Sequence, residues 1–153
     1  MEFEEKIQAH VLSVWRERKE FFGGRGKEGM LILTNKRLMF IKKTEAGMRW
    51  WGAVRTRQIV RLLRSKDVMF TEDGYDEESL RTDAENKKNQ EIHFNDILNV
   101  DFEEKVWGSV LLLEILEGDQ KKKYQFSIVK DWVKYPLSAP TKYMKADWSG
   151  FVK

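Results

Sequence analysis

Short, strand-prone apolar stretches are separated by polar stretches along this chain, and two pairs of them predict β-hairpins. In the stretch Gly29 to Ile41, two strand-prone apolar runs flank a polar break. Asn35 stands in that break and tolerates the positive φ of a tight turn. Farther on, the apolar run Ser109 to Leu116 and the alternating run Lys123 to Val129 flank a turn at Glu117-Gly118-Asp119. Each of these pairs of runs is expected to form two antiparallel strands.

Other parts of the pattern predict helices at both ends of the chain. From Glu2 to Glu20, apolar residues recur at spacings of three and four, which predicts an amphipathic helix. A competing interpretation is a first strand, because His10 to Arg16 also alternates. The tail beyond Pro140 predicts a closing helix by the same spacing, and Ile92 to Phe102 predicts strand structure. The apolar residues of the tail are Met144, Trp148, Phe151 and Val152.

Between the first hairpin and Ile92 the chain carries a long insertion, about 42–90, whose charge changes sign. Lys42 to Lys66 holds eight basic residues against Glu45 alone, a net charge of +7, and Asp67 to Glu91 has a net charge of −6. The basic half predicts an amphipathic helix with apolar and arginine faces, although Met48 to Val54 could instead be a strand before a shorter helix. The acidic half, Thr71 to Gln90, predicts an exposed loop because it holds almost no large apolar side chains.

Three segments resemble the GRAM and bacterial PH-like domains, which belong to the pleckstrin-homology superfold. The first hairpin carries the pattern G-x-L-x-L-T-N-K-R-L-x-F, with Gly29, Leu33, Thr34, Asn35, Arg37 and Phe40 as its fold-motif residues. The other two segments contribute Ile92, Phe94, Asp96, Ile97 and Val100, and then Tyr124, Phe126 and Trp132.

The resemblance implies an α+β fold in which a strongly bent antiparallel sheet or partly open barrel is closed by a C-terminal helix. With it we expect one domain over residues 1–153, an extra N-terminal helix and a helical insertion. The basic signature K/R-x-R of phosphoinositide-binding pleckstrin domains has no match, since Lys36 and Arg37 are adjacent.

Composition limits the kinds of partner, active site and cellular compartment that the chain is expected to have. The net charge of +3 and the pI near 9.0 give only slight support for an anionic partner, and the absence of cysteine fits a reducing compartment. His10 and His93 are the only histidines and lie in no catalytic or metal-binding motif, so no catalytic residue, metal or cofactor is expected. Without an apolar run of membrane-spanning length or a basic leader, the chain is expected to be cytoplasmic, with peripheral association at a membrane.

The basic aromatic segment, defined as Arg49 to Lys66, is the predicted binding site. Its tryptophans could lie at a membrane–water interface while its cations face anionic headgroups. The residues concerned are Arg49, Trp50, Trp51, Arg55, Arg57, Arg61, Arg64 and Lys66. In the competing interpretation, Trp51, Ile59 and Leu62 pack on the sheet and the arginines pair with the acidic stretch.

The sequence therefore predicts a non-enzymatic module that docks on an anionic membrane surface. A protein-interaction or self-assembly adaptor, using an open sheet edge or the apolar stripe of a terminal helix, is the alternative. Binding of single-stranded nucleic acid is less favoured, because the acidic stretch nearly balances the basic one.

Overall fold

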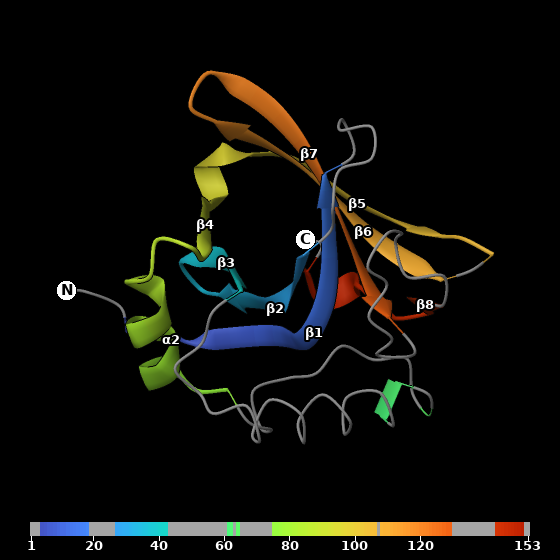
Figure 1. Cartoon of the computed structure of the whole chain (residues 1–153), viewed down its shortest axis with the longest axis horizontal. Helices are drawn as coiled ribbons and strands as arrows, with labels where there is room; N and C mark the ends of the chain where they lie inside the picture. Colours follow the sequence, from blue (N-terminus) through green and yellow to red (C-terminus); the bar gives the residue numbers. More distant parts are fainter. Residues whose placement is uncertain are drawn as a thin grey trace.

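An antiparallel sheet of eight strands is the main feature of the protein (Figure 1). The computed structural model describes residues 4–18, 27–42, 61–62, 64, 75–106, 108–129 and 143–151. Seven strands follow the order β4-β3-β2-β1-β7-β6-β5, and β8 pairs with β7. The strands are β1 (Ile7–Arg18), β2 (Lys27–Thr34), β3 (Arg37–Ile41), β4 (Gln90–His93), β5 (Ile97–Glu104), β6 (Ser109–Glu117), β7 (Gln120–Val129) and β8 (Tyr143–Met144). The helical elements described from end to end are α2 (Glu77–Ala84) and the 3-10 turns η1 (Phe94–Asp96) and η2 (Ser149–Phe151).

The N-terminal apolar stripe forms β1 rather than a helix, so the expected N-terminal helix is wrong and the competing strand interpretation is confirmed. β1 pairs with β2 along most of its length and with β7 through its last four residues, and it bends sharply between them (Figure 1). Its register shifts between Ile7 and Ala9 and between Val11 and Val14. An extra residue at a β-bulge stretches the two-residue repeat of a strand to three. The buried residues therefore recur at spacings that imitate a helix.

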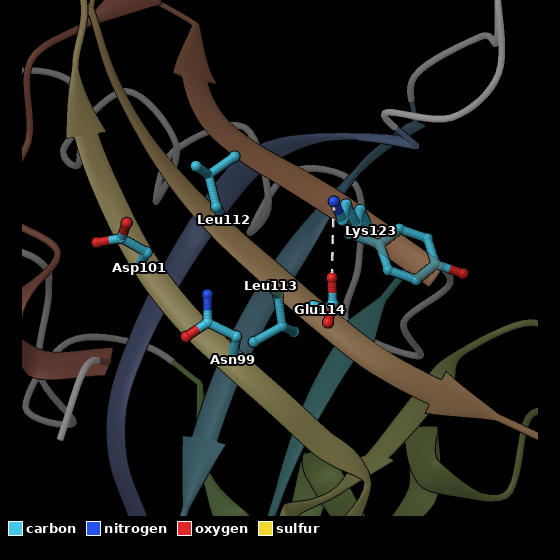
Figure 2. Close-up of a pocket in the computed structure, with 7 residues that line it drawn as sticks. Asn99, Asp101, Leu112, Leu113, Glu114 and Lys123 are labelled. Carbon is cyan, nitrogen blue, oxygen red and sulfur yellow. Dashed lines mark ion pairs between the residues drawn. The ribbon is translucent and has the colours of Figure 1, made fainter. Parts of the chain in front are cut away.

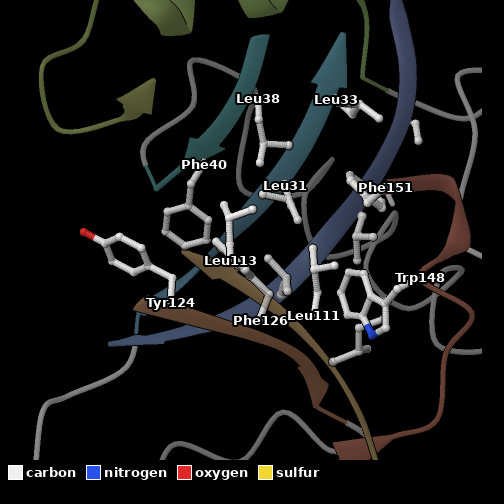
Figure 3. Packing of buried hydrophobic residues seen from close by; sticks show 14 of the residues in the cluster. Leu31, Leu33, Leu38, Phe40, Leu111, Leu113, Tyr124, Phe126, Trp148 and Phe151 are labelled. Atoms are coloured by element: carbon white, nitrogen blue, oxygen red, sulfur yellow. The ribbon is translucent and has the colours of Figure 1, made fainter. Parts of the chain in front are cut away.

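Both faces of the first half of the sheet are buried. The inner face carries the larger core cluster, in which Phe40 and Phe126 meet at a ring-centroid distance of 5.9 Å (Figure 3). The outer face of β1, β2 and β3 carries a second cluster, made of Ile7, Met30, Ile32, Met39, Ile41, Tyr75 and Leu80. Because β2 is buried on both sides, its sequence reads as a continuous apolar run.

α2 covers that outer face, so the acidic stretch is not the exposed loop that its composition predicted. Asp76 caps the helix by accepting a hydrogen bond from the backbone N–H of Ser79 at 2.8 Å. Tyr75 and Leu80 are buried, and the Tyr75 hydroxyl donates a hydrogen bond to the carboxylate of the buried Asp83. Two large apolar side chains are thus enough to attach an otherwise polar helix.

The two predicted hairpins are confirmed. β2 and β3 pair around Asn35-Lys36, and β6 and β7 pair around Gly118-Asp119. Gly118 has φ +60°, a left-handed conformation that glycine adopts without steric cost. β4 and β5 confirm the strand prediction for 92–102, with η1 between them.

The C-terminal tail contains β8, an isolated bridge at Asp147 and η2 in place of a closing helix. Trp148 and Phe151 enter the larger cluster as an edge-to-face pair, with ring centroids 5.9 Å apart. The described residues contain one complete α-helix, α2, and β4 and β5 are the two ends of an open strand order. The expected PH-like fold, closed by a C-terminal helix and extended by an N-terminal helix and a helical insertion, is therefore wrong.

Candidate functional site

The polar residues of the first hairpin turn hold the N-terminal segment in place. The Thr34 hydroxyl oxygen accepts hydrogen bonds from the backbone N–H groups of Lys36 and Arg37, each at 3.0 Å. The Asn35 side chain accepts from the Lys6 N–H at 2.7 Å and donates to the Glu4 carbonyl at 3.1 Å. These contacts give the predicted fold-motif residues a structural role.

Arg37 joins this turn to two other segments. Its guanidinium donates two hydrogen bonds of 3.0 Å to the Glu5 carboxylate and lies 3.2 Å from Glu91 of β4. Burial alone would raise the pKa of Glu5, but the hydrogen bonds from Arg37 and Thr34 outweigh burial and hold that pKa below its ordinary value. The interaction therefore stabilises the fold and leaves no open anion site at Arg37.

Arg16 lies at the opposite end of the first hairpin, between aromatic rings. Its guanidinium carbon is 4.3 Å from the centroid of Phe40 and 5.4 Å from that of Tyr124. Nη1 donates to the Gln90 side-chain oxygen at 2.6 Å, and Gln90 in turn donates to Glu117 at 2.6 Å. Burial lowers the pKa of Arg16. The two hydrogen bonds link β1 to β4 directly and to β6 through Gln90, so Arg16 has a structural role.

The basic aromatic segment is placed only in part. Leu62 is 2% exposed and belongs to the larger core cluster, whereas Arg61 and Arg64 are exposed. All three have helical backbone. The other predicted site residues lie outside the described residues, namely Arg49, Trp50, Trp51, Arg55, Arg57 and Lys66.

β5 is an outer strand whose far edge has no strand partner among the described residues. Lys105 and Gly108 exchange both backbone hydrogen bonds at the turn into β6, at 2.6 and 3.3 Å. In an antiparallel ladder such pairs alternate with pairs whose N–H and C=O groups point away. The register with β6 therefore directs the backbone groups of Val100, Phe102 and Glu104 outward. We call this feature the β5 edge.

An apolar pocket of about 290 Å³ lies on the core side of the β5 edge. Val100 pairs with Leu113, a core residue, so both side chains face inward. Phe94 and Phe102 remain 40% and 44% exposed beside this opening, although they are large apolar side chains. The pocket is lined by Leu33, Leu38, Phe94, Ile97, Val100, Leu111, Leu113 and Phe151.

A second pocket, of about 160 Å³, lies along the same strand (Figure 2). Its lining combines charged and amide side chains with leucine and tyrosine, and we call it the polar pocket because of its charged side chains. Asn99 pairs with Glu114, and Asp101 with Leu112, so these four side chains share the face opposite to Val100. Lys123 completes a row across the sheet, 3.7 Å from Glu114. Leu113 and Tyr124 also line this pocket.

Sequence reasoning found the alternation of β5 but missed its importance. The apolar residues at 98, 100 and 102 alternate with Asn99 and Asp101, which indicates a strand with two unlike faces. Whether such a strand lies at the centre or at the edge of a sheet depends on pairings with distant segments, and no local signal reports them.

The described residues contain no group of three or more histidine or acidic side chains that could hold a metal ion. His10 is buried in β1, and His93 is exposed in β4, 3.1 Å from Glu91. Among the helices in the part of the chain that the structure describes, none is long and apolar enough to cross a membrane.

Comparison with protein-family models, with curated proteins and with solved structures finds no match to this chain. The resemblance of its hairpin motif to the GRAM and bacterial PH-like family stays a prediction. The features of the molecule that bear on its function are the β5 edge with its two pockets and the described part of the basic aromatic segment.

Proposed function

We propose that this protein is a non-enzymatic interaction module that binds an extended segment of a protein partner along the β5 edge. The observation that carries the proposal is an outer strand with outward backbone groups beside an apolar pocket. When a peptide is added to a sheet as a further strand, main-chain hydrogen bonds supply affinity and the pockets select alternate side chains. β5 offers both requirements within eight residues.

The apolar side chains around the β5 edge support the proposal. Leu98 and Phe102 are both 44% exposed, and Val100 is half-buried. An added strand would cover this surface and remove it from water, at about 25 cal/mol per Å² of apolar area. Natural sheets usually protect an edge with charges, prolines or bulges. β5 carries three carboxylates and a register shift between Ile97 and Asn99, yet it leaves Leu98 and Phe102 exposed for a partner to cover.

The test uses peptides of about eight residues, the length of β5, selected from a random library against the wild-type protein. Val100→Pro removes an outward N–H group without breaking the ladder to β6, and Phe102→Ser removes an exposed ring. Leu116→Ser is the matched control, because Leu116 is a 37% exposed apolar residue of β6 away from this edge.

We expect the two β5 variants to weaken peptide binding roughly tenfold or more, since each removes a hot-spot contact, while the control leaves it unchanged. Thermal unfolding checks that each variant is folded. The proposal is wrong if selected peptides bind the folded Val100→Pro and Phe102→Ser proteins as tightly as wild type.

Docking on an anionic membrane surface is a second candidate function, favoured by one observation. Leu62 packs in the core while Arg61 and Arg64 are exposed, as expected for a helix with an apolar and a basic face. We expect wild-type protein to sediment with vesicles containing anionic lipid at low salt, and replacement of Arg57, Arg61 and Arg64 by Glu to abolish it. Sedimentation that survives this replacement would exclude the basic aromatic segment as the docking site.

A further inference from the structure

The β5 edge lies between two pockets, of which one is lined by apolar side chains alone and the other also by charged ones, and we infer that its partner is an extended segment in which apolar and basic residues alternate. This inference rests on the proposed function and specifies its partner. Ile97 and Val100 line the apolar pocket, while Asn99 and Asp101 line the polar one. Successive side chains of an added strand point to opposite faces, so alternate residues would enter the two pockets.

The polar pocket favours a cationic side chain. Two carboxylates, Asp101 and Glu114, line it together with one cation, Lys123, which lies 3.7 Å from Glu114 (Figure 2). Leu112 lies between them in the register and offers an apolar floor. A lysine or arginine can place its methylene stem over such a floor and its charged end beside the carboxylates.

Asp101 is the carboxylate most open to a new partner. Glu103 lies 2.7 Å from Lys105, and Glu104 lies 3.1 Å from Lys145. Within the described residues, Asp101 forms no ion pair, and its carboxylate instead accepts a hydrogen bond of 2.8 Å from the N–H of Phe102.

This hydrogen bond occupies one of the outward N–H groups that an added strand requires. A partner strand that contributes only backbone groups would have to break the hydrogen bond between the Phe102 N–H and the Asp101 carboxylate, which would leave that carboxylate without a donor. A partner strand with a lysine or arginine opposite Asp101 would supply a new donor to the Asp101 carboxylate. A backbone carbonyl of the same partner strand would then accept the hydrogen bond from the Phe102 N–H. Asp101 thus weakens the binding of neutral strands to the β5 edge and favours the binding of basic ones.

A second copy of this chain fits the β5 edge poorly. In an antiparallel pair of two β5 strands, placing Phe102 opposite Phe102 puts Asp101 opposite Glu103. Placing Phe102 opposite Val100 puts Asp101 opposite Asp101, whereas placing Val100 opposite Val100 puts Asp101 opposite the uncharged Asn99. Like charges directly opposite each other destabilise a strand pair, so two of these three registers disfavour a second copy, and none of them offers Asp101 a partner of opposite sign.

The experiment measures binding of three labelled, end-blocked peptides of about eight residues by fluorescence anisotropy. One alternates Val with Lys, one Val with Ser and one Val with Glu. We expect the Val–Lys peptide to bind wild type most tightly, by roughly fivefold over Val–Ser for a single cross-strand charge pair.

Asp101→Asn should remove this preference, and Asp101→Lys should transfer it to the Val–Glu peptide. Asp119→Asn, which makes the same charge change at the exposed β6–β7 turn, is the control and should leave the preference intact.

The outcomes separate the inference from the proposed function. If all three peptides bind equally and Val100→Pro abolishes binding, the β5 edge binds strands but the basic partner is wrong. If a Val–Lys preference persists in Asp101→Asn, or is lost equally in Asp119→Asn, the attraction is general and the inference is also overturned.

If no peptide binds, or a folded Val100→Pro protein binds all three as wild type does, the proposed function itself fails. A concentration-dependent increase in light scattering by the protein alone would identify a second copy as the occupant instead.

Discussion

Replacement of Gly29 by alanine tests a close backbone approach between β2 and β3. A Cβ atom at position 29 would lie 2.6 Å from the Ile41 carbonyl oxygen and 2.7 Å from the Cζ atom of Phe40. The first contact is with backbone of the neighbouring strand, which cannot turn aside as a side chain can. Phe40 is itself fully buried against Phe126, so its ring has little room to move.

The expected cost follows from these two contacts. Overpacking a filled core costs about 1–3 kcal/mol, and the lower entropy of an unfolded chain with alanine returns about 0.4–1 kcal/mol. We therefore expect Gly29→Ala to lower the free energy of unfolding by about 1–2 kcal/mol. For a chain of this size, that corresponds to a fall in Tm of about 2–8 °C.

Urea and thermal unfolding followed by circular dichroism measure this change, and Gly118 provides the control. Gly118 has φ +60° and no neighbouring atom within 4 Å of an added Cβ, so its substitution is limited by conformation rather than space. Asn tolerates this φ, so Gly118→Asn should be milder than Gly118→Ala, whereas Gly29→Asn should be worse than Gly29→Ala. A Gly29→Ala protein as stable as wild type would refute the packing of β3 and Phe40 against Gly29.

Two further predictions concern the N-terminal segment and the basic aromatic segment. Because the folded-state pKa of Glu5 lies below its unfolded value, its contribution to stability is present above the unfolded pKa and is lost as pH falls through the folded pKa. Glu5→Gln should therefore lower stability near neutral pH and flatten the acid limb of a urea-unfolding series, and an unchanged limb would contradict the Arg37 contact. Leu62→Ala should cost about 2–5 kcal/mol because Leu62 is buried in the core, whereas Arg64→Ala, at an exposed position, should stay within about 0.5 kcal/mol. Equal effects of these two substitutions in thermal unfolding would show that the segment does not pack on the sheet.

Elements specified by neighbouring residues could be predicted from the sequence. The β2–β3 and β6–β7 hairpins each have two strand-prone apolar runs and a turn residue, Asn35 or Gly118, within one short stretch. β1 was predicted as a helix because its bulges conceal the two-residue period, and only its pairing with β2 and β7 decides its structure. The competing strand interpretation used the short stretch 10–16, where the alternation is least interrupted.

The remaining errors have a related cause. α2 has few apolar residues, so its composition predicted a loop, and its attachment depends on an apolar sheet face built by distant strands. Trp148 and Phe151 have the spacing of residues on one face of a helix. Their contacts in the larger core cluster, rather than a helix, determine where they lie. The β5 edge could not be predicted either, because the position of β5 at the end of the described strand order depends on the pairing of every other strand.

The double pairing of β1 has a consequence for how the chain folds. Its last residues, Trp15 to Arg18, pair with residues 124–127 of β7, more than a hundred positions away. The two hairpins need only local loop closure, whereas this pairing must close a very long loop and pay its entropy first. We expect the hairpins to form early and the junction of β1 with β7 to be among the last contacts made. During synthesis on the ribosome, β1 therefore waits for most of the chain before its own hydrogen bonds are complete.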